Sequence, residues 1–184
     1  MILIVGATGI LGGMITQRLL ESGKEVRILV RHNSPAEELA KQRMATSPQL
    51  LIEAGAQPVY GDLKDRASLD QACQGIETVI TTANSAMRGG EDNVDTVDRH
   101  GNRNLIEAAR AAGVKQFIFI SFLGANLNHP VPLFKAKAEK LRPVFVDILY
   151  RAVLRHQKYD TVCHVCEIFI KLRHFFHIGL TQCK

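Results

Sequence analysis

The chain has 184 residues, 46% of them hydrophobic and 22% charged, a composition typical of a soluble globular protein with a single core. No apolar run reaches the roughly 20 residues of a membrane-spanning helix, and residues 2–5 are not preceded by a basic leader. We therefore expect no membrane span, no signal peptide and a cytoplasmic location.

The net charge of +5 lies mainly in the tail: residues 1–140 hold sixteen Lys and Arg against fifteen Asp and Glu, and residues 141–184 hold seven against three. A nearly neutral body gives no electrostatic case for nucleic-acid binding.

The first 121 residues alternate strand-like and helix-like segments, the pattern of a parallel sheet covered by helices. Short apolar or β-branched runs predict five strands, at residues 1–5, 25–30, 57–60, 78–82 and 116–121. Apolar spacing and capping residues predict helices at 10–21, from 34, from 47, at 65–73 and at 94–112. Residues 146–149 are a candidate sixth strand. We predict an α/β domain over residues 1–150, with the doubly wound parallel sheet of a Rossmann fold.

A glycine-rich loop links the first strand to the first helix and reads Gly6-Ala7-Thr8-Gly9-Ile10-Leu11-Gly12. Glycines here allow a tight turn and a close approach of the backbone to a pyrophosphate, which the N-terminus of the following helix attracts. The spacing is GxxGxxG, which differs from the standard GxGxxG. We assign the diphosphate of a dinucleotide to Gly6, Thr8, Gly9, Ile10, Leu11 and Gly12; the alternative is a tight turn without a ligand.

The residue that ends the second strand indicates which dinucleotide is bound. An NAD-binding domain usually has Asp or Glu there, which accepts hydrogen bonds from the ribose hydroxyl. This chain has Arg31, 19 positions after Gly12. A guanidinium suits the dianionic 2′-phosphate of NADP(H), so we expect NADP(H) to be preferred over NAD(H). The alternative is a solvated surface arginine.

Several stretches match the pattern of one family: Val5-Gly6-Ala7-Thr8-Gly9 with Gly12, Leu29-Val30-Arg31, Gly61-Asp62-Leu63, and Gly113-Val114 leading to Phe119-Ile120-Ser121. Together they resemble the NmrA-like group of atypical short-chain dehydrogenases/reductases, over about residues 1–140. The resemblance implies that Asp62 and Leu63 lie beside the adenine, and that Thr82, Ala83 and Asn84 run past the cofactor riboses. A turn or capping role is the alternative for Asp62.

The resemblance also suggests catalytic residues. Typical short-chain reductases use Tyr-x-x-x-Lys, in which the lysine lowers the pKa of the phenol so that it can exchange a proton. If Lys137 is that lysine, Leu133 stands where the tyrosine belongs. Some NmrA-like and isoflavone-reductase-like enzymes use the lysine without the tyrosine, which points to Ser121 and Lys137 as the catalytic candidates. A solvated helix lysine is the alternative for Lys137, and Lys135 is a weaker substitute.

The family pattern stops at about Tyr150, and residues 151–184 form a basic tail rich in His and Cys. Cys163-x-x-Cys166 followed by His174-x-x-His177 resembles a zinc motif, but the gap and the His spacing fit poorly, so we assign no metal. We expect an amphipathic helix there. The abrupt change in composition also suggests a truncated or frameshifted end.

Three functions remain open from the sequence. The first is an NADPH-dependent reductase of a small carbonyl, quinone or enone, with Lys137 or a water supplying the proton. The second is a non-catalytic NADP(H) sensor that acts through a protein partner, which Leu133 in the tyrosine position favours. The third is a truncated fragment without activity.

Overall fold

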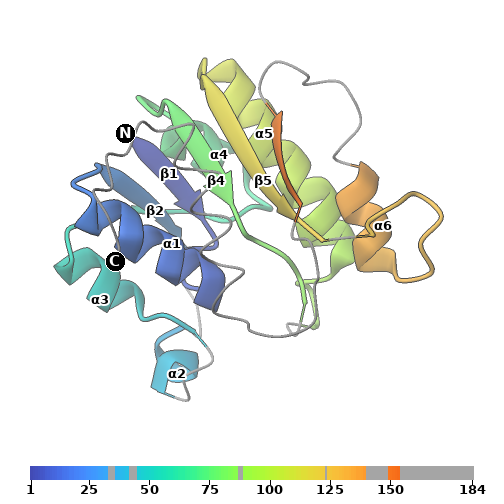
Figure 1. The fold of residues 1–184 in the computed structure, drawn as a ribbon, viewed down its shortest axis with the longest axis horizontal. Coiled ribbons are helices and arrows are strands. Elements are labelled where there is room, and N and C mark those ends of the chain that lie inside the picture. The colour runs from blue at the N-terminus through green and yellow to red at the C-terminus, as the bar shows by residue number, and fades with distance from the viewer. Residues whose placement is uncertain (33–35, 42–44, 87–88, 123, 140–148, 154–184) are drawn as a thin grey trace, which may run out of the picture.

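The computed structural model describes residues 1–32, 36–41, 45–86, 89–122, 124–139 and 149–153. Its sheet has six parallel strands in the order β3-β2-β1-β4-β5-β6 (Figure 1). The strands are β1 (Ile2–Val5), β2 (Val26–Val30), β3 (Gln57–Tyr60), β4 (Thr78–Thr81), β5 (Gln116–Ser121) and β6 (Leu149–Val153). This is the strand order of the doubly wound Rossmann fold, and it confirms the predicted fold class.

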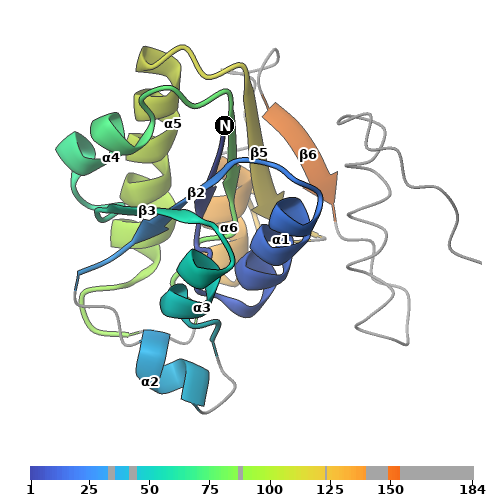
Figure 2. The same ribbon diagram turned by 90° about the vertical axis from the view of Figure 1, so that its left-hand side faces the viewer.

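Helices cover both faces of the sheet. They are α1 (Ile10–Glu21), α2 (Ala36–Lys41), α3 (Pro48–Glu53), α4 (Arg66–Ala72), η1 (Val94–Gly101), α5 (Asn102–Ala111) and α6 (Pro132–Glu139). Figure 2 shows α1 and α3 on one side of the sheet and α4 and α5 on the other. Among the described residues, no helix is long and apolar enough to cross a membrane.

The alternation of side chains along β1 explains the two cores. Leu3 and Val5 point into the cluster shared with α4 and α5, and Ile2 and Ile4 point into the cluster shared with α1 and α3. All four are buried, since both faces of a parallel sheet are covered. Burial of each such side chain stabilises the fold by about 1.5–3 kcal/mol, so the glycine loop that follows β1 starts from a rigid base.

Local capping also follows the sequence. The hydroxyl of Ser47 accepts a hydrogen bond from the Leu50 amide at the start of α3, and the carboxylate of Asp65 accepts one from the Ala67 amide at the start of α4. Such caps satisfy amides that the first helical turn leaves without partners. The predicted helix starts at these two residues are confirmed. The expected start at residue 34 lies outside the described residues, and α2 is helical from Ala36.

Two details differ from the expectations, and the exposure of two apolar side chains of α1 adds a third observation. The single helix expected at residues 94–112 is divided: η1 is a π-helix, and only α5 is an α-helix. The sixth strand contains Leu149 of the expected segment and continues to Val153, while residues 146–148 lie outside the described residues. Ile10 and Met14 of α1 are 59% and 40% exposed, because the helix buries Gly12, Gly13, Ile15, Thr16 and Leu19 instead.

Candidate cofactor-binding site

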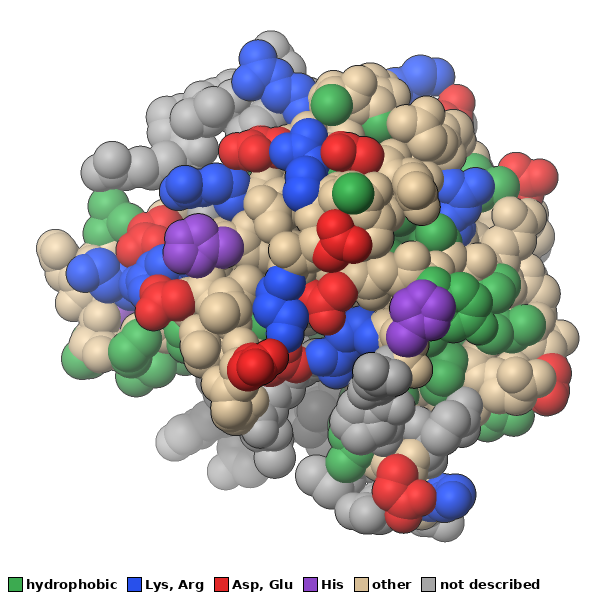
Figure 3. Space-filling view, turned by 180° about the vertical axis from the view of Figure 1, so that it is seen from behind, with side chains coloured by type: hydrophobic (Ala, Val, Ile, Leu, Met, Phe, Trp, Pro, Cys, Tyr) green, Lys and Arg blue, Asp and Glu red, His purple; other side chains and the backbone are tan. Residues whose placement is uncertain are grey.

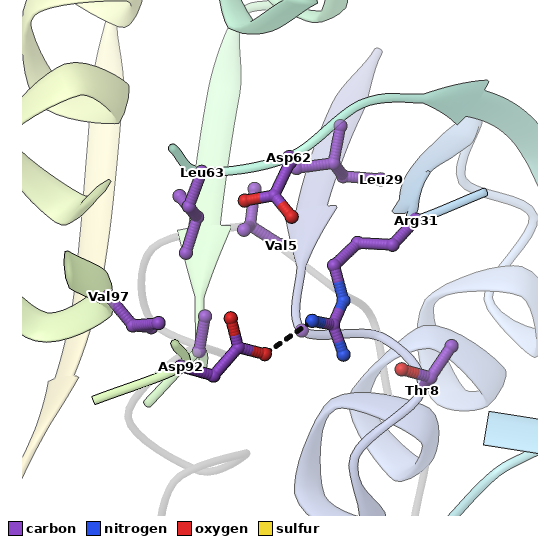
Figure 4. Close-up of a pocket in the computed structure, with 10 residues that line it drawn as sticks. Val5, Thr8, Leu29, Arg31, Asp62, Leu63, Asp92 and Val97 are labelled. Atoms are coloured by element: carbon purple, nitrogen blue, oxygen red, sulfur yellow. Dashed lines mark hydrogen bonds and ion pairs between the residues drawn. The ribbon is translucent and has the colours of Figure 1, made fainter. Parts of the chain in front are cut away.

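A pocket opens at the carboxyl ends of the strands, where the strand order reverses between β1 and β4. This is where ligands bind in open α/β sheets. Figure 4 shows that the pocket gathers residues from the glycine loop, the end of β2, the segment after β3 and the start of η1. Six of the residues predicted for the cofactor line it: Gly6, Thr8, Arg31, Asp62, Leu63 and Ala83. Val5, Leu29, Asp92 and Val97 complete the lining.

The glycine loop has the shape that its sequence predicts. Gly6 has a positive φ of 88°, and a Cβ there would lie 2.7 Å from the Thr82 hydroxyl oxygen. A Cβ on Gly12 would lie only 2.1 Å from the carbonyl oxygen of Gly6. Glycine at position 6 therefore lets the segment after β4 lie close to the loop, and glycine at position 12 lets the start of α1 pack on it.

The start of α1 is arranged to attract an anion. Gly9 is the N-cap residue, so no side chain caps the first turn, and that turn contains no acidic residue. The first amides of a helix, together with its dipole, favour a negatively charged group. Ile10 and Leu11 occupy this turn, with the side chain of Ile10 exposed and that of Leu11 half-buried. Their backbones, not their side chains, are the groups that a diphosphate would contact.

Arg31 follows β2 and extends toward Thr8 and Asp92 (Figure 4). Its guanidinium donates to the carboxylate of Asp92 at 2.5 Å, and the ammonium group of Lys64 donates to the other oxygen of that carboxylate at 2.9 Å. Burial alone would raise the pKa of Asp92, but the hydrogen bonds from Lys64 and Arg31 outweigh it and lower the pKa to about 2. The carboxylate is therefore ionised between two cations at neutral pH.

The segment after β4 is held next to the glycine loop. The Thr82 hydroxyl donates to the carbonyl oxygen of Gly6 at 3.2 Å, and the Thr82 amide donates to that of Val5 at 2.9 Å. The Asn84 side chain bonds within its own turn, accepting from the Ala86 amide at 2.9 Å. Of the three residues that the family resemblance places at the riboses, Ala83 lines the pocket and Thr82 and Asn84 flank it.

Lys137 of α6 lies behind this segment and is buried, with 2% of its surface exposed. Its ammonium group donates to the Ala83 carbonyl oxygen at 3.0 Å and lies 3.3 Å from a carboxylate oxygen of Asp98. Burial lowers the pKa of Lys137, and the attraction of Asp98 opposes that shift. The lysine thus holds the backbone of a residue that lines the pocket, and it is not the solvated helix residue that the sequence left as the alternative.

The other catalytic candidates have different settings. Ser121 ends β5 and is buried, and its hydroxyl has no hydrogen-bond partner among the described residues. Leu133 is half-buried and Lys135 is exposed on α6. Phe134 stacks between Phe122 and His129, with ring centroids 4.9 and 4.4 Å away. The catalytic roles of Ser121 and Lys137 remain predictions.

Sequence reasoning missed three charged residues at this site. Lys64 could have been found, since it directly follows the Asp62-Leu63 pair. Asp92 and Asp98 carry no motif: they are brought to the site by the loop before η1 and by η1 itself. Figure 3 shows that acidic and basic side chains are mixed on the face that it draws. Among the exposed ion pairs of the described residues, Arg66 contacts Asp70 at 2.8 Å and Glu107 at 3.0 Å.

Comparison with known proteins places this geometry in a family. Residues 6–160 match the family described as NAD(P)H-binding. The photosystem II assembly factor Ycf39 of Cyanophora paradoxa is 37% identical over 136 residues, which are 74% of this chain and 38% of that protein. The chain thus spans about two fifths of the length of the curated relatives it matches, since the Ycf39 of Guillardia theta is covered to 39%.

Solved structures show the same fold. The NADPH-dependent quinone oxidoreductase QOR2 of Escherichia coli, complexed with NADPH, superposes with a TM-score of 0.59 at 28% identity, covering 86% of this chain and 50% of that one. A protein of Bacillus halodurans described as a candidate NAD-dependent epimerase/dehydratase superposes with a TM-score of 0.65 at 24% identity, covering 87% of this chain and 73% of that one. With its strand order, its glycine loop and the match over residues 6–160, the chain belongs to the NAD(P)H-binding family, within the superfamily of NmrA-like and atypical short-chain dehydrogenases/reductases.

Proposed function

We propose that this protein binds NADP(H) in preference to NAD(H), and that it is an NADPH-dependent reductase of a small carbonyl, quinone or enone. The observation that carries the cofactor preference is Arg31, whose guanidinium lies in the pocket that Gly6 and Thr8 also line. Lys64 is a second cation nearby, since it pairs with Asp92, the carboxylate that Arg31 also contacts. Two cations at the end of β2 and after β3 suit a dianionic phosphate better than a ribose hydroxyl. A cytoplasmic location remains part of the proposal.

The residues present fit a dinucleotide. Glycine at positions 6 and 12 allows the loop and helix to pack without side chains, and the uncapped first turn of α1 offers amides to a diphosphate. Leu29 and Leu63 supply apolar surface at the adenine end of the pocket, and Val97 faces them from η1. When bound, the nicotinamide supplies the hydride for reduction of the substrate.

The contribution of this chain to the reaction is to hold the segment after β4 and to provide a proton. Lys137 fixes the Ala83 carbonyl, and its lowered pKa makes its ammonium group a better proton donor than an exposed lysine. We assign the proton to Lys137 or to a water. The substrate class is supported by the similarity in fold to QOR2, an NADPH-dependent quinone oxidoreductase.

A non-catalytic NADP(H)-sensing role is the second candidate. Leu133 provides no phenol in the tyrosine position, and the Lys137 ammonium group is already engaged by Ala83 and Asp98. The relatives named as photosystem II assembly factors also favour a role that depends on a protein partner.

NADPH oxidation, screened across quinones and enones with the full-length protein, separates the two candidates. If no quinone or enone supports NADPH oxidation while the protein still binds NADPH, the reductase proposal is wrong.

The cofactor preference is tested by Arg31→Ala, with affinities for NADPH and NADH measured by calorimetric titration. The loss of a charge-assisted contact with the phosphate should lower the preference for NADPH at least about tenfold. Arg27→Ala is the matched control, because Arg27 lies on the same strand but donates to the carbonyls of Ala72 and Gln74, outside the pocket. An unchanged ratio in Arg31→Ala would refute the preference.

A further inference from the structure

The carboxylate of Asp92 connects the two cations of the candidate phosphate site. One oxygen accepts from Arg31 at 2.5 Å and the other accepts from Lys64 at 2.9 Å. Arg31 follows β2 and Lys64 follows β3, and both line an open pocket next to the candidate cofactor pocket, so the bridge joins two separate parts of that pocket's rim. In this geometry each oxygen takes one cation, as two oxygens of a phosphate group would.

The position of Asp92 is fixed by its neighbours in the chain. Asn93 is the N-cap of η1: its side chain accepts from the Thr96 amide at 3.1 Å, and its backbone amide donates to the Thr96 hydroxyl at 3.0 Å. The Thr96 hydroxyl also donates to the Glu91 carbonyl at 2.6 Å. These hydrogen bonds hold the backbone on both sides of Asp92, and they therefore fix the position from which its carboxylate extends into the pocket.

Competition for the cations follows from the local charges. The open pocket beside Arg31 and Lys64 is also lined by Asp62, Asp65, Glu91 and Asp92. Of these carboxylates, Asp92 is the one for which contacts with both cations are observed, and only 15% of its side chain is exposed. A dianionic phosphate that enters between the cations must therefore exchange with Asp92, because two anions cannot share these donors without repulsion.

We propose that Asp92 is a specificity-determining residue, which holds Arg31 and Lys64 and limits how strongly the pocket prefers a 2′-phosphorylated dinucleotide over an unphosphorylated one. The inference rests on the proposed function, in which Arg31 binds the 2′-phosphate. It makes Asp92 an internal competitor of that phosphate for both cations, Arg31 and Lys64. An unphosphorylated ribose carries no charge to compete for the cations, so its binding does not require the exchange.

The test is Asp92→Asn, titrated with NADPH and with NADH. The variant keeps the shape of the side chain and removes the negative charge, so affinity for NADPH should rise about three- to tenfold while affinity for NADH stays unchanged. Asp95→Asn is the matched control: Asp95 lies three residues further on, is exposed and pairs with Arg99 outside the pocket. It removes the same charge and should change neither affinity.

Other outcomes overturn the proposal. Weaker NADH binding by Asp92→Asn would make Asp92 an acceptor for the ribose hydroxyl, and a loss of both affinities would make it a structural residue. Arg31→Ala separates this inference from the proposed function. If Arg31→Ala lowers the NADPH preference and Asp92→Asn leaves it unchanged, only the competition fails; if neither variant alters the preference, the proposed function fails as well.

A measurement on the unmodified protein covers the case in which Asp92→Asn does not fold. Adenosine 2′-monophosphate, added to the ¹³C-labelled protein, should shift the carboxyl resonance of Asp92 as the phosphate takes over its donors. Adenosine alone should leave that resonance in place. An unmoved Asp92 resonance at saturating nucleotide would contradict the exchange.

Discussion

The ammonium group of Lys137 lies 3.3 Å from a carboxylate oxygen of Asp98, and the two side chains are only 2% and 0% exposed. The other oxygen of Asp98 accepts from the Ser85 amide at 2.9 Å, while Lys137 donates to the Ala83 carbonyl. This buried pair therefore ties α6 and η1 to the segment after β4. The wall of the pocket is fixed by residues that do not themselves line it.

Replacement of one member of the pair should be costly. Asp98→Asn leaves the Lys137 charge buried without its counter-ion, and we expect a loss of about 3 kcal/mol in the free energy of unfolding, measured with urea. The double variant Asp98→Asn/Lys137→Met removes both charges and should lose less than the sum of the single variants. Glu77→Gln is the control, because its pair with Lys115 is exposed and should contribute nothing measurable. Additive losses would show that the two charges do not interact.

Replacement of Gly12 and of Gly9 by alanine should have different effects on stability. Gly12→Ala places a Cβ against the backbone of Gly6, so both stability and cofactor binding should fall. Gly9→Ala meets the Gly6 carbonyl oxygen at 3.3 Å, a tight contact that a small shift relieves, and Gly9 has an ordinary φ of −73°. We expect the melting temperature of Gly9→Ala to change little and its affinity for NADPH to fall, because Gly9 is the N-cap next to the amides that we assign to the diphosphate, where a methyl group would hinder close approach. Equal effects of both variants on melting would contradict this division.

The stability that Asp92 contributes should depend on pH. Its pKa is lowered from 3.8 to about 2 in the folded chain, so its contribution is present above pH 3.8 and is lost as the pH falls through about 2. Unfolding of the unmodified protein and of Asp92→Asn should differ near neutral pH and converge over that acidic window. A difference that persists below it would mean that Asp92 stabilises the fold by something other than its charge.

Much of the fold could be predicted from the sequence. Strands were recognisable because each apolar run is short and bounded by turn residues, and α3 and α4 because Ser47 and Asp65 are strong caps. The glycine loop could be predicted because its glycine spacing has a steric cause: a Cβ at Gly6 or Gly12 would collide with neighbouring atoms. These signals are local, and they agree with the tertiary structure.

Other features depend on tertiary contacts that local patterns do not encode. The π-helix η1 has the composition of an ordinary amphipathic helix, and its buried Asp98 contacts Lys137 and Ser85, which are distant from it in the sequence. Asp92 looks like one more charged loop residue until β2 and β3 bring Arg31 and Lys64 to it. Apolar spacing alone also does not show which side chains of α1 are buried, since Ile10 and Met14 are exposed.

The most direct measurement is a crystal structure of the full-length protein with NADP⁺. The account predicts that the diphosphate lies over the backbone amides at the start of α1, and that the 2′-phosphate lies within hydrogen-bond distance of Arg31 and Lys64, with Asp92 released from at least one of them. A dinucleotide bound elsewhere, or a 2′-phosphate that points away from Arg31, would contradict it.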